Sequence, residues 1–337
     1  MSQLRKDVFS GRWVIIEQTD VLRPSDFRFT RFTRETTLCP FCEGHEASTP
    51  PEIYALRPNG SAPNTTGWKV RVVPNSRLRL NIEGDLDRRP EGFHDLMNGI
   101  GADEIVAETP RHDRSLHELE VHEIADVLRT FIVRILDLEK DKRLRYVLVF
   151  KNHGVEAGAR TITHSISQLM ALPVNPRVIK SKLVAAHEYY ELKDRCIYCD
   201  VLQQELHDRK RLITENDDFA AIAPFASRSP FEVCVLPRFH SSAFCQMTSP
   251  QIENAAGILR DVLQRLDKTL GGPPYNLALQ NRPFLRPREG YWKTIDEDFH
   301  WHIEILPQVI GMTGFERASW FFYNPVPPEL AAKCLRD

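Results

Sequence analysis

The stretch Leu38-Cys39-Pro40-Phe41-Cys42 is a Cys-x-x-Cys knuckle, and Arg195-Cys196-Ile197-Tyr198-Cys199 repeats it in the second half of the chain. After each knuckle comes a strand-like apolar run that ends near a histidine, at Pro110-Arg111-His112 and at Pro237-Arg238-Phe239-His240. The same features recur in the same order, so an internal duplication explains them better than coincidence does.

Hydrophobic periodicity extends the repeat beyond the histidines. Apolar residues recur at helical spacing after each histidine, and the second helix follows a Ser249-Pro250 start signal. A β-rich segment and then a short histidine-containing strand follow in each half. The expected helices are 121–138 and 252–266, with a joining helix in 173–192; the expected strands are 104–107, 146–150 and 163–169, then 231–236, 275–279 and 300–306.

Two units of strands, each with one covering helix, predict an α+β fold with mainly antiparallel sheet. We expect residues 1–180 to form the N-terminal half and residues 181–337 to form the C-terminal half. Each half would hold one set of metal ligands.

Composition excludes several classes of protein. The chain has 337 residues and a formal net charge of -2, without the basic stripe of a nucleic-acid-binding surface. It has no apolar run of about 18 residues, so no membrane partner is expected. The first residues are charged and polar, which argues against a secretory signal and for a cytoplasmic location.

The seven cysteines include the two Cys-x-x-Cys pairs, a usage that indicates metal binding or redox chemistry in a cytosolic protein. A thioredoxin-like redox motif would open a helix inside a βαβ unit, and neither pair has that context. Cys234, Cys245 and Cys334 are scattered, and we interpret them as small buried apolar residues.

Each half contains two cysteines and two histidines that suit one tetrahedral metal. Two thiolates and two imidazoles are ligands that favour Zn²⁺, and a closed set of four protein ligands is typical of a structural site. The alternative is that these are ordinary buried thiols and surface histidines, and the second site leaves zinc and iron undistinguished. The predicted sets are Cys39, Cys42, His112 and His164, and Cys196, Cys199, His240 and His300.

The segment Gly158-Ala159-Arg160-Thr161-Ile162-Thr163-His164-Ser165-Ile166-Ser167-Gln168 resembles the active-site strand of the galactose-1-phosphate uridylyltransferase family, most closely its ADP-glucose phosphorylase members. The resemblance implies a homodimer, two histidine-triad-like halves, and a nucleotide-sugar or sugar 1-phosphate as ligand. Other matching stretches lie along nearly the whole chain, including Gly11-Arg12-Trp13-Val14-Ile15, Val70-Arg71-Val72-Val73-Pro74-Asn75, Glu108-Thr109-Pro110-Arg111-His112-Asp113-Arg114 and His300-Trp301-His302-Ile303-Glu304-Ile305.

The chain departs from the family where the family's chemistry is done. The family's strand has the pattern His-x-His-x-Gln, in which the first histidine binds zinc, the second attacks the α-phosphate, and the glutamine contacts that phosphate. Here His164 and Gln168 match, but Ile166 stands at the nucleophile position. Alternate strand residues share a face, so Ile166 is expected to point where the histidine would. Isoleucine cannot attack phosphorus, and nucleotidyl transfer through a covalent histidine is expected to be lost.

A second departure lies near the end of the chain. The family's sugar-phosphate loop usually has the pattern Gly-Phe-Glu-x-Gly-Thr-Gly, whereas this chain has Gly314-Phe315-Glu316-Arg317-Ala318-Ser319-Trp320. Small residues let backbone amides approach a phosphate, and Trp320 would obstruct that approach. Glu316 matches the family's sugar-hydroxyl contact.

The resemblance also implies residues around the base, ribose and phosphates. The alternative for each is a satisfied turn or loop residue, and for Asn75 and Asn152, which closely follow apolar strands, both interpretations stay open. The residues implied are Arg23, Asn75, Asn152, Thr161, Ser167 and Gln168.

His302 keeps an enzymatic alternative open. It lies in the second half's counterpart of the altered strand, beside Glu304, and could serve as base or nucleophile in a relocated site. Three hypotheses follow: a family enzyme with altered chemistry, a catalytically inactive module that binds or senses a nucleotide-sugar, or a structural partner that uses only the zinc-stapled dimer. The sequence does not distinguish uridine from adenosine, nor one hexose from another.

Overall fold

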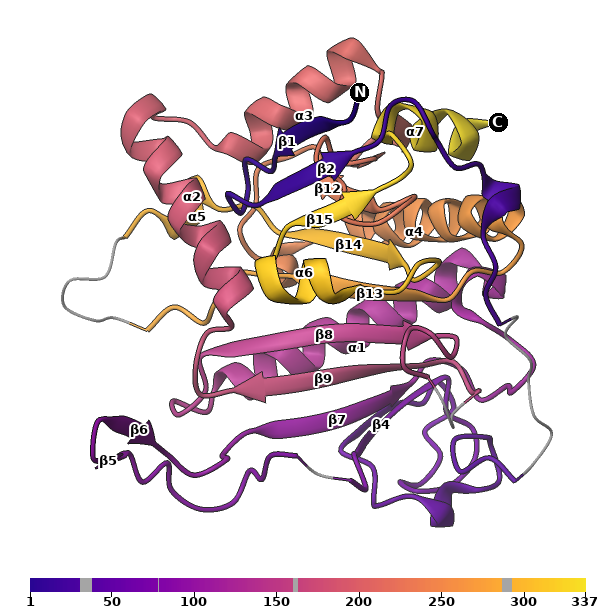
Figure 1. The fold of residues 1–337 in the computed structure, drawn as a ribbon. Coiled ribbons are helices and arrows are strands. Elements are labelled where there is room, and N and C mark those ends of the chain that lie inside the picture. The colour runs from indigo at the N-terminus through magenta and orange to yellow at the C-terminus, as the bar shows by residue number, and fades with distance from the viewer. Residues whose placement is uncertain (31–37, 78, 160–162, 287–292) are drawn as a thin grey trace.

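The computed structural model describes residues 1–30, 38–77, 79–159, 163–286 and 293–337. Its centre is a ten-stranded sheet with the order β10-β11-β12-β14-β13-β8-β9-β7-β4-β3 (Figure 1). Every neighbouring pair in this sheet is antiparallel, which confirms the predicted α+β class. The strands are β3 (Tyr54–Leu56), β4 (Val70–Pro74), β7 (Ala102–Ala107), β8 (Tyr146–His153), β9 (Ile166–Leu172), β10 (Leu212–Glu215), β11 (Phe219–Ile222), β12 (Val233–Pro237), β13 (Tyr275–Gln280) and β14 (His302–Pro307).

The strand order is symmetric about the β8–β13 pair. Outward from this pair the strands run β9, β7, β4, β3 on one side and β14, β12, β11, β10 on the other. Phe150 faces Ala278 across the centre; Gln168 is the next partner on the first side, and Glu304 is the next partner on the second. The counterpart of Gln168 is therefore Glu304, and the counterpart of Ile166 is His302. This order agrees with a duplication, while the boundary at residue 180 stays a prediction.

Two long helices, α1 (Val121–Glu139) and α4 (Ser249–Leu270), cover one face of the sheet behind its strands (Figure 1). Their apolar residues recur at helical spacing, and this stripe packs on alternate strand residues such as Leu169 and Ile303. Pro250 lies in the first turn of α4, and Gly271 ends that helix at φ +77°, a backbone conformation that favours glycine. Burying each large apolar side chain here contributes about 1.5–3 kcal/mol.

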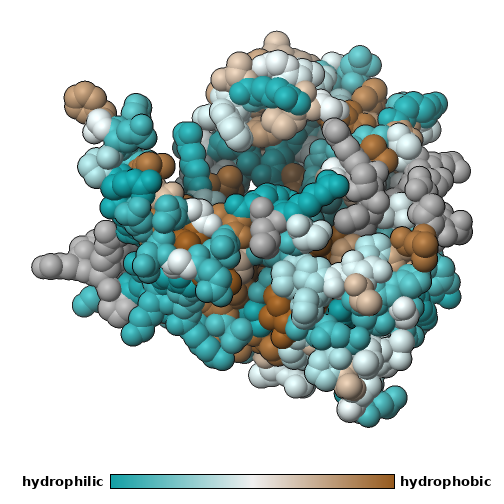
Figure 2. Space-filling view, turned by 90° about the horizontal axis from the view of Figure 1, so that it is seen from below, coloured by the Kyte–Doolittle hydropathy of each residue, from teal (hydrophilic) through white to brown (hydrophobic). Residues whose placement is uncertain are grey.

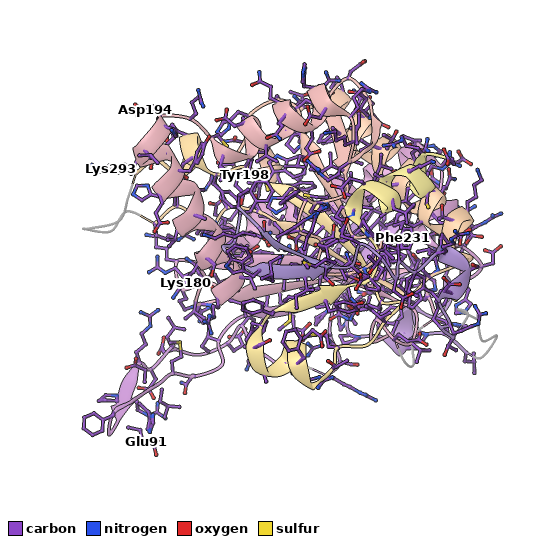
Figure 3. All side chains as sticks on the ribbon, turned by 45° about the horizontal axis from the view of Figure 1, so that its top comes forward. Glu91, Lys180, Asp194, Tyr198, Phe231 and Lys293 are labelled. Carbon is purple, nitrogen blue, oxygen red and sulfur yellow. The ribbon has the colours of Figure 1, made fainter. Side chains whose placement is uncertain are left out.

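The opposite face of the sheet is covered unevenly. Helices α2 (Arg177–Lys193) and α3 (Ile197–Asp208) cover the second half, and α6 (Gly314–Ser319) lies in front of β13 and β14 (Figure 1). Tyr198 of α3 is fully buried beneath this layer and stacks on Phe9 at 4.3 Å (Figure 3). On this side α2 reaches the start of β8, where Tyr146 and Leu148 share an apolar cluster with Ile179 and Leu183. Within the described residues, no helix lies over the rest of β8 or over β9 (Figure 1), and we call this side of the two strands the open face.

A small second sheet joins the two ends of the chain. It consists of β1 (Gln3–Lys6), β2 (Trp13–Ile16) and β15 (Phe322–Asn324), with β2 and β15 parallel. Arg5 also forms an ion pair with Glu329 at 2.9 Å. The first strands therefore pack against the second half in space, although the sequence pattern assigns them to the first.

The remaining elements are short. The hairpin of β5 (Arg89–Glu91) and β6 (His94–Leu96) projects from the body at the lower left of Figure 1, with Glu91 far from the core (Figure 3). From below, the surface is mostly hydrophilic, with apolar residues gathered near its middle (Figure 2). No helix in the described ranges is long and apolar enough to cross a membrane. The other helices are α5 (Ile295–Asp298), α7 (Pro328–Arg336) and the 3-10 turns Pro24–Asp26, Glu46–Ser48, Leu116–Glu118 and Phe244–Gln246.

Candidate functional site

Four side chains from three segments converge in the first Cys/His cluster. Cys39 and Cys42 lie in a turn, His112 follows β7, and His164 precedes β9. Cys42 Sγ is 3.4 Å from His112 Nδ1 and 3.7 Å from His164 Nδ1. Cys39 Sγ is also 3.7 Å from His164 Nδ1, and all four ligand atoms lie within 4.8 Å of one another.

This geometry fits a tetrahedral zinc ion. Zinc–sulfur and zinc–nitrogen bonds of about 2.3 and 2.0 Å at tetrahedral angles separate sulfur from nitrogen by about 3.5 Å. Each imidazole also has a partner for its other nitrogen. His164 Nε2 donates to the Thr109 carbonyl oxygen at 2.7 Å, and His112 Nε2 lies 3.2 Å from Thr163 Oγ1. Such contacts turn Nδ1 toward the metal position.

The second cluster repeats the first. Cys199 Sγ lies 3.4 Å from His240 Nδ1 and 3.6 Å from His300 Nδ1. His240 Nε2 donates to the Asp296 carbonyl at 2.8 Å, and His300 Nε2 donates to the Pro237 carbonyl at 3.0 Å. With Cys196, these residues form the second group of possible metal ligands. The structure thus brings together both ligand sets that the sequence pattern names.

Burial sets the protonation of the first cluster in the metal-free protein. Burial, with the Cys39 thiol beside it, raises the pKa of Cys42 to about 12. Burial also lowers the pKa of His164 to about 4, so its imidazole is neutral at pH 7. A bound metal would displace the Cys42 proton and coordinate a neutral imidazole.

Ile166 lies at the start of β9 on the open face. It is 7% exposed and packs in a small apolar cluster with Phe41, Trp68 and Ile105. The position at which the family resemblance expects a histidine is therefore occupied by an aliphatic side chain among apolar neighbours.

Asn75 and Gln168 are connected on the open face through two residues that the sequence pattern did not single out. Asn75 Nδ2 donates to both carboxylate oxygens of Asp103, at 3.1 and 3.2 Å. Arg79 Nε lies 3.7 Å from Asp103 Oδ2, and Arg79 Nη2 lies 3.5 Å from Gln168 Oε1. Asp103 alternates with Ile105 along β7, a weak signal for this face. Nothing in the sequence marks Arg79, because its position depends on a loop that folds back over β9.

Ser167 lies on the other face of β9, contrary to the expectation that it contacts the ligand. Its hydroxyl donates to Glu108 Oε1 at 2.5 Å, and the Ser165 hydroxyl donates to Glu108 Oε2 at 2.5 Å. Lys151 Nζ donates to the same carboxylate at 2.7 Å. Strand alternation puts Ser167 opposite to Ile166 and Gln168, so this buried network lies beneath the strand on the side of α1 and α4.

Of the other implied contacts, Asn152 shares the open face with Gln168, because Phe150, two residues before it on β8, pairs with Gln168. Asn152 is on β8, and its Oδ1 accepts a hydrogen bond from Asn276 Nδ2 at 2.7 Å, which links the two halves. Arg23 is exposed at the start of a 3-10 turn, where its backbone N–H donates to Asp26 at 2.8 Å. Thr161 lies outside the described residues.

The counterpart strand β14 has its polar residues buried under α2. His302 is 1% exposed, and its Nδ1 donates to the His300 carbonyl at 3.0 Å. Lys182 Nζ donates to His302 Nε2 at 2.7 Å and to Glu304 at 2.6 Å. Burial and the Lys182 charge lower the pKa of His302 to about 4. The imidazole is therefore neutral, and its one lone pair is engaged by the ammonium group.

Glu304 is the centre of this second cluster. Besides Lys182, it accepts hydrogen bonds from Arg228 at 2.6 Å and Gln280 at 3.2 Å. Burial alone would raise the pKa of Glu304, but Arg228 and Lys182 hold it well below its usual value. A cavity of about 460 Å³ lies over this carboxylate, and Glu316 and Trp320 are among its lining residues.

The Gly314–Trp320 segment forms a short helix, α6, with Trp320 at its C-terminal cap. The Glu316 carboxylate accepts hydrogen bonds from the backbone N–H and the hydroxyl of Thr313, which cap the first turn. Trp320 has φ +57° and is 64% exposed at the cavity rim. The carboxylate that the resemblance assigns to a sugar contact thus also stabilises the start of α6.

The fold and the two Cys/His clusters define a duplicated α+β protein with paired candidate metal centres. Models of the galactose-1-phosphate uridyl transferase N-terminal and C-terminal domains match residues 93–176 and 182–310. An ADP-glucose phosphorylase from Arabidopsis thaliana is 33% identical over 99% of this chain and 92% of its own length. A galactose-1-phosphate uridylyltransferase from Thermotoga maritima is 28% identical over 100% of this chain and 98% of its own.

Solved structures agree with these matches. The crystal structure of an Arabidopsis thaliana ADP-glucose phosphorylase with bound ADP-glucose has a TM-score of 0.82 and 32% identity, and the match covers 100% of this chain and 99% of that one. A uridylyltransferase structure has a TM-score of 0.76 and 26% identity, over 100% and 97%. The chain belongs to the galactose-1-phosphate uridylyltransferase family.

Proposed function

We propose that this protein binds a nucleotide-sugar or sugar 1-phosphate on the open face of β8 and β9, and that it transfers no nucleotide through a covalent histidine. Family membership supports a function of the hexose-1-phosphate nucleotidyltransferase type. The ADP-glucose bound to a relative of the same fold supports the ligand class. The observation that carries the second part is Ile166, which lies where the family has its nucleophile.

Among the described residues of the strand, no side chain next to Ile166 substitutes for the missing imidazole. Ile166 has no lone pair, and the hydroxyls of Ser165 and Ser167 donate to Glu108 beneath the strand. Loss of a covalent nucleophile costs on the order of 10⁶ in turnover in a well-studied enzyme. The conclusion is a nucleotide-sugar-binding protein of an enzyme family, with the covalent route absent.

Relocated chemistry at His302 is the alternative that we set aside. A nucleophile or general base needs a free lone pair and room for a substrate. His302 is fully buried, and its Nε2 accepts from Lys182. Lys182 and α2 would both have to move before the imidazole met a phosphate.

The proposal also covers the metal content and the assembly of the protein. Zinc in both clusters, about two ions per chain, would be structural, because four protein ligands leave no position for substrate. A cytoplasmic homodimer, with halves at residues 1–180 and 181–337, remains our expectation from sequence and family resemblance.

Two measurements test the proposal. Thermal shift with ADP-glucose, UDP-glucose and glucose 1-phosphate is expected to raise the melting temperature for at least one ligand, because a ligand that binds the native state stabilises it by mass action. Gln168→Ala should reduce that shift, while Arg114→Ala, which removes an exposed side chain at a different site, serves as a control. Intact mass spectrometry after incubation should show no nucleotide monophosphate adduct. A wild-type protein stabilised by none of the ligands, or one that carries an adduct, contradicts the proposal.

A further inference from the structure

Arg79 places a guanidinium group beside Gln168 on the open face. Its Nη2 lies 3.5 Å from Gln168 Oε1, its Nη1 lies 3.9 Å from Met170 Sδ, and its Nε lies 3.7 Å from Asp103 Oδ2. All three separations are long for hydrogen bonds of a guanidinium group. The neighbours therefore orient Arg79 without satisfying its donors.

Asp103 fixes this arrangement from below. Its carboxylate is fully buried, and it accepts two hydrogen bonds from the Asn75 amide, so its position on β7 is well defined. The Arg79 side chain is 58% exposed. The buried Asp103 carboxylate thus lies against the Nε side of the exposed Arg79 guanidinium group. The other N–H groups of Arg79 face solvent above β9.

Gln168 adds further donors at the same place. Its Oε1 faces Arg79, and this leaves the two N–H groups of Nε2 for a ligand. A guanidinium carries five N–H donors and no acceptor, and its planar fork matches the oxygens of a phosphate. The guanidinium group lies beside the Gln168 amide, so the chemistry favours a ligand that is negatively charged and rich in acceptors. A neutral sugar ring would not use the cation in this way.

We propose that Arg79 adds a cation to the phosphate contact that the family resemblance gives to Gln168, so that the two side chains form a phosphate subsite and bind the diphosphate of a nucleotide-sugar without a covalent bond. The inference rests on the proposed function and adds to it a residue that neither the sequence pattern nor the family resemblance assigns. Ile166 borders the subsite two residues before Gln168 on the same strand face. The bound phosphate meets a methyl group there, and its charge is balanced by the guanidinium group.

Isothermal titration calorimetry with matched ligands tests the subsite. Arg79→Ala should weaken binding of ADP-glucose or UDP-glucose about tenfold to hundredfold, since it removes charge-assisted hydrogen bonds. The same variant should bind adenosine and uridine, which have no phosphate, within about twofold of wild type. The affinity of Arg79→Lys for the nucleotide-sugar should lie between those of wild type and Arg79→Ala. Lysine keeps the positive charge but cannot form the paired hydrogen bonds of a planar guanidinium group.

Arg77→Ala is the matched control. Arg77 is exposed two residues earlier, and in the described structure its side chain makes no hydrogen bond or ion pair. The Arg77→Ala substitution removes the same charge as Arg79→Ala. Because salt screens the exposed charge of Arg77, its loss should change the affinity for the nucleotide-sugar by no more than about threefold. Equal losses for Arg77→Ala and Arg79→Ala would show a diffuse charge effect and overturn the subsite.

The remaining outcomes separate the two proposals. If wild type binds the nucleotide-sugar and Arg79→Ala binds it equally well, the subsite is wrong and the proposed function stands. If Arg79→Ala loses nucleoside and nucleotide-sugar affinity alike, the residue acts on the whole pocket, and the subsite is again wrong. If wild type binds neither nucleotide-sugar, the proposed function fails and the subsite fails with it.

Discussion

Strands β9 and β14 are counterparts in the duplicated sheet, yet they support opposite chemistry. β9 presents Gln168 on the open face with Ile166 packed beside it among apolar side chains, whereas β14 places His302 and Glu304 under α2 in an ion-paired cluster. The half that retains access has lost the imidazole, and the half that has an imidazole has engaged its lone pair. Reactivity therefore depends on access and a free lone pair as much as on the residue type.

The metal clusters differ much less than the strands beside them. Both use two cysteines and two histidines, and all four imidazoles present Nδ1 to the cluster. Ligand geometry tolerates little change, while a strand face can exchange residues whenever its neighbours can accommodate them. The four predictions below test how far this contrast extends.

Removing one thiolate from either cluster should have the largest effect. Structural zinc contributes on the order of 10 kcal/mol of apparent folding free energy. Cys39→Ser and Cys196→Ser should each lower the melting temperature by about 10 °C or more, or prevent folding. Differential scanning calorimetry measures the melting temperature, and elemental analysis measures the zinc content. We expect about two zinc ions per wild-type chain.

Cys334→Ser is the control, because Cys334 belongs to neither cluster. A soluble Cys39→Ser protein with an unchanged melting temperature would contradict a structural metal. Wild type purified without chelator and holding less than one metal per chain would do the same.

Glu304→Gln should have the next largest effect on stability, because it removes the carboxylate charge that balances Lys182 and Arg228. Breaking a buried ion pair costs about 3–5 kcal/mol. The cations hold the folded-state pKa of Glu304 below its unfolded value. The stabilisation from the carboxylate is therefore fully present above about pH 4.5 and is lost as the pH falls further.

Denaturant unfolding from pH 7 to pH 3 measures this effect. The difference between wild type and Glu304→Gln should be greatest near neutral pH and should shrink in acid. Gln168→Glu is the reciprocal change on the open face, and it should leave stability within about 1 kcal/mol because Arg79 is exposed. Curves that stay parallel for Glu304→Gln and wild type down to pH 3 would refute the ionised cluster.

Ile166→His returns an imidazole to the half that has access. We expect slow release of sugar 1-phosphate and a nucleotidyl-histidine adduct detectable by intact mass spectrometry, since His164 and Gln168 still flank the position. Turnover should stay low while Trp320 remains, and should increase when Ala318-Ser319-Trp320 is also changed to Gly-Thr-Gly.

Ile166→Asn is the control, because it is polar and cannot carry the nucleotide. Suppose that Ile166→His binds the nucleotide-sugar but forms no adduct after long incubation. The open face would then lack more than its nucleophile, and a pure binding role would account for the protein. An adduct that maps to His302 in any variant would reverse the contrast between the strands.

Asn276→Ala should give the smallest effect, at the line where the halves meet. It removes hydrogen bonds to Asn152 at 2.7 Å and to the Ala157 carbonyl at 2.9 Å, which together contribute about 1–2 kcal/mol. Amide hydrogen exchange should increase around residues 154–159. Asn276→Asp retains the size but not the donor, and should behave like Asn276→Ala. Unchanged exchange in both variants would show that the backbone pairing alone joins the halves.

The features that repeat locally could be predicted from the sequence. The two Cys/His sets and the two amphipathic helices depend on residue types at short spacing, and the repeat itself indicates the antiparallel class. α1 and α4 start at Val121 and Ser249, close to the expected limits. The strand expected at 163–169 begins at Ile166, because the preceding residues turn His164 toward its cluster.

The rest depends on contacts between distant segments. Lys182 reaches His302 from α2, and Arg79 reaches Gln168 from a loop, so neither partner is visible in the strand's own sequence. The second Cys-x-x-Cys pair opens α3, with Cys196 at its cap, which the flanking residues did not indicate. Ser167 was expected to contact the ligand because the family resemblance identifies positions, whereas strand alternation determines the face.

The parallel pairing of β2 with β15 also governs the order in which the protein can be made. Residues 14–16 are synthesised long before their partners at residues 322–324. Until then the N-terminal hairpin has an unpaired edge, and Phe9 has to wait for Tyr198. The hairpin of β1 and β2 therefore reaches its native place only after residues 322–324 have been made. A nascent chain that stalled before residue 322 would expose the unpaired edge of this hairpin to other proteins.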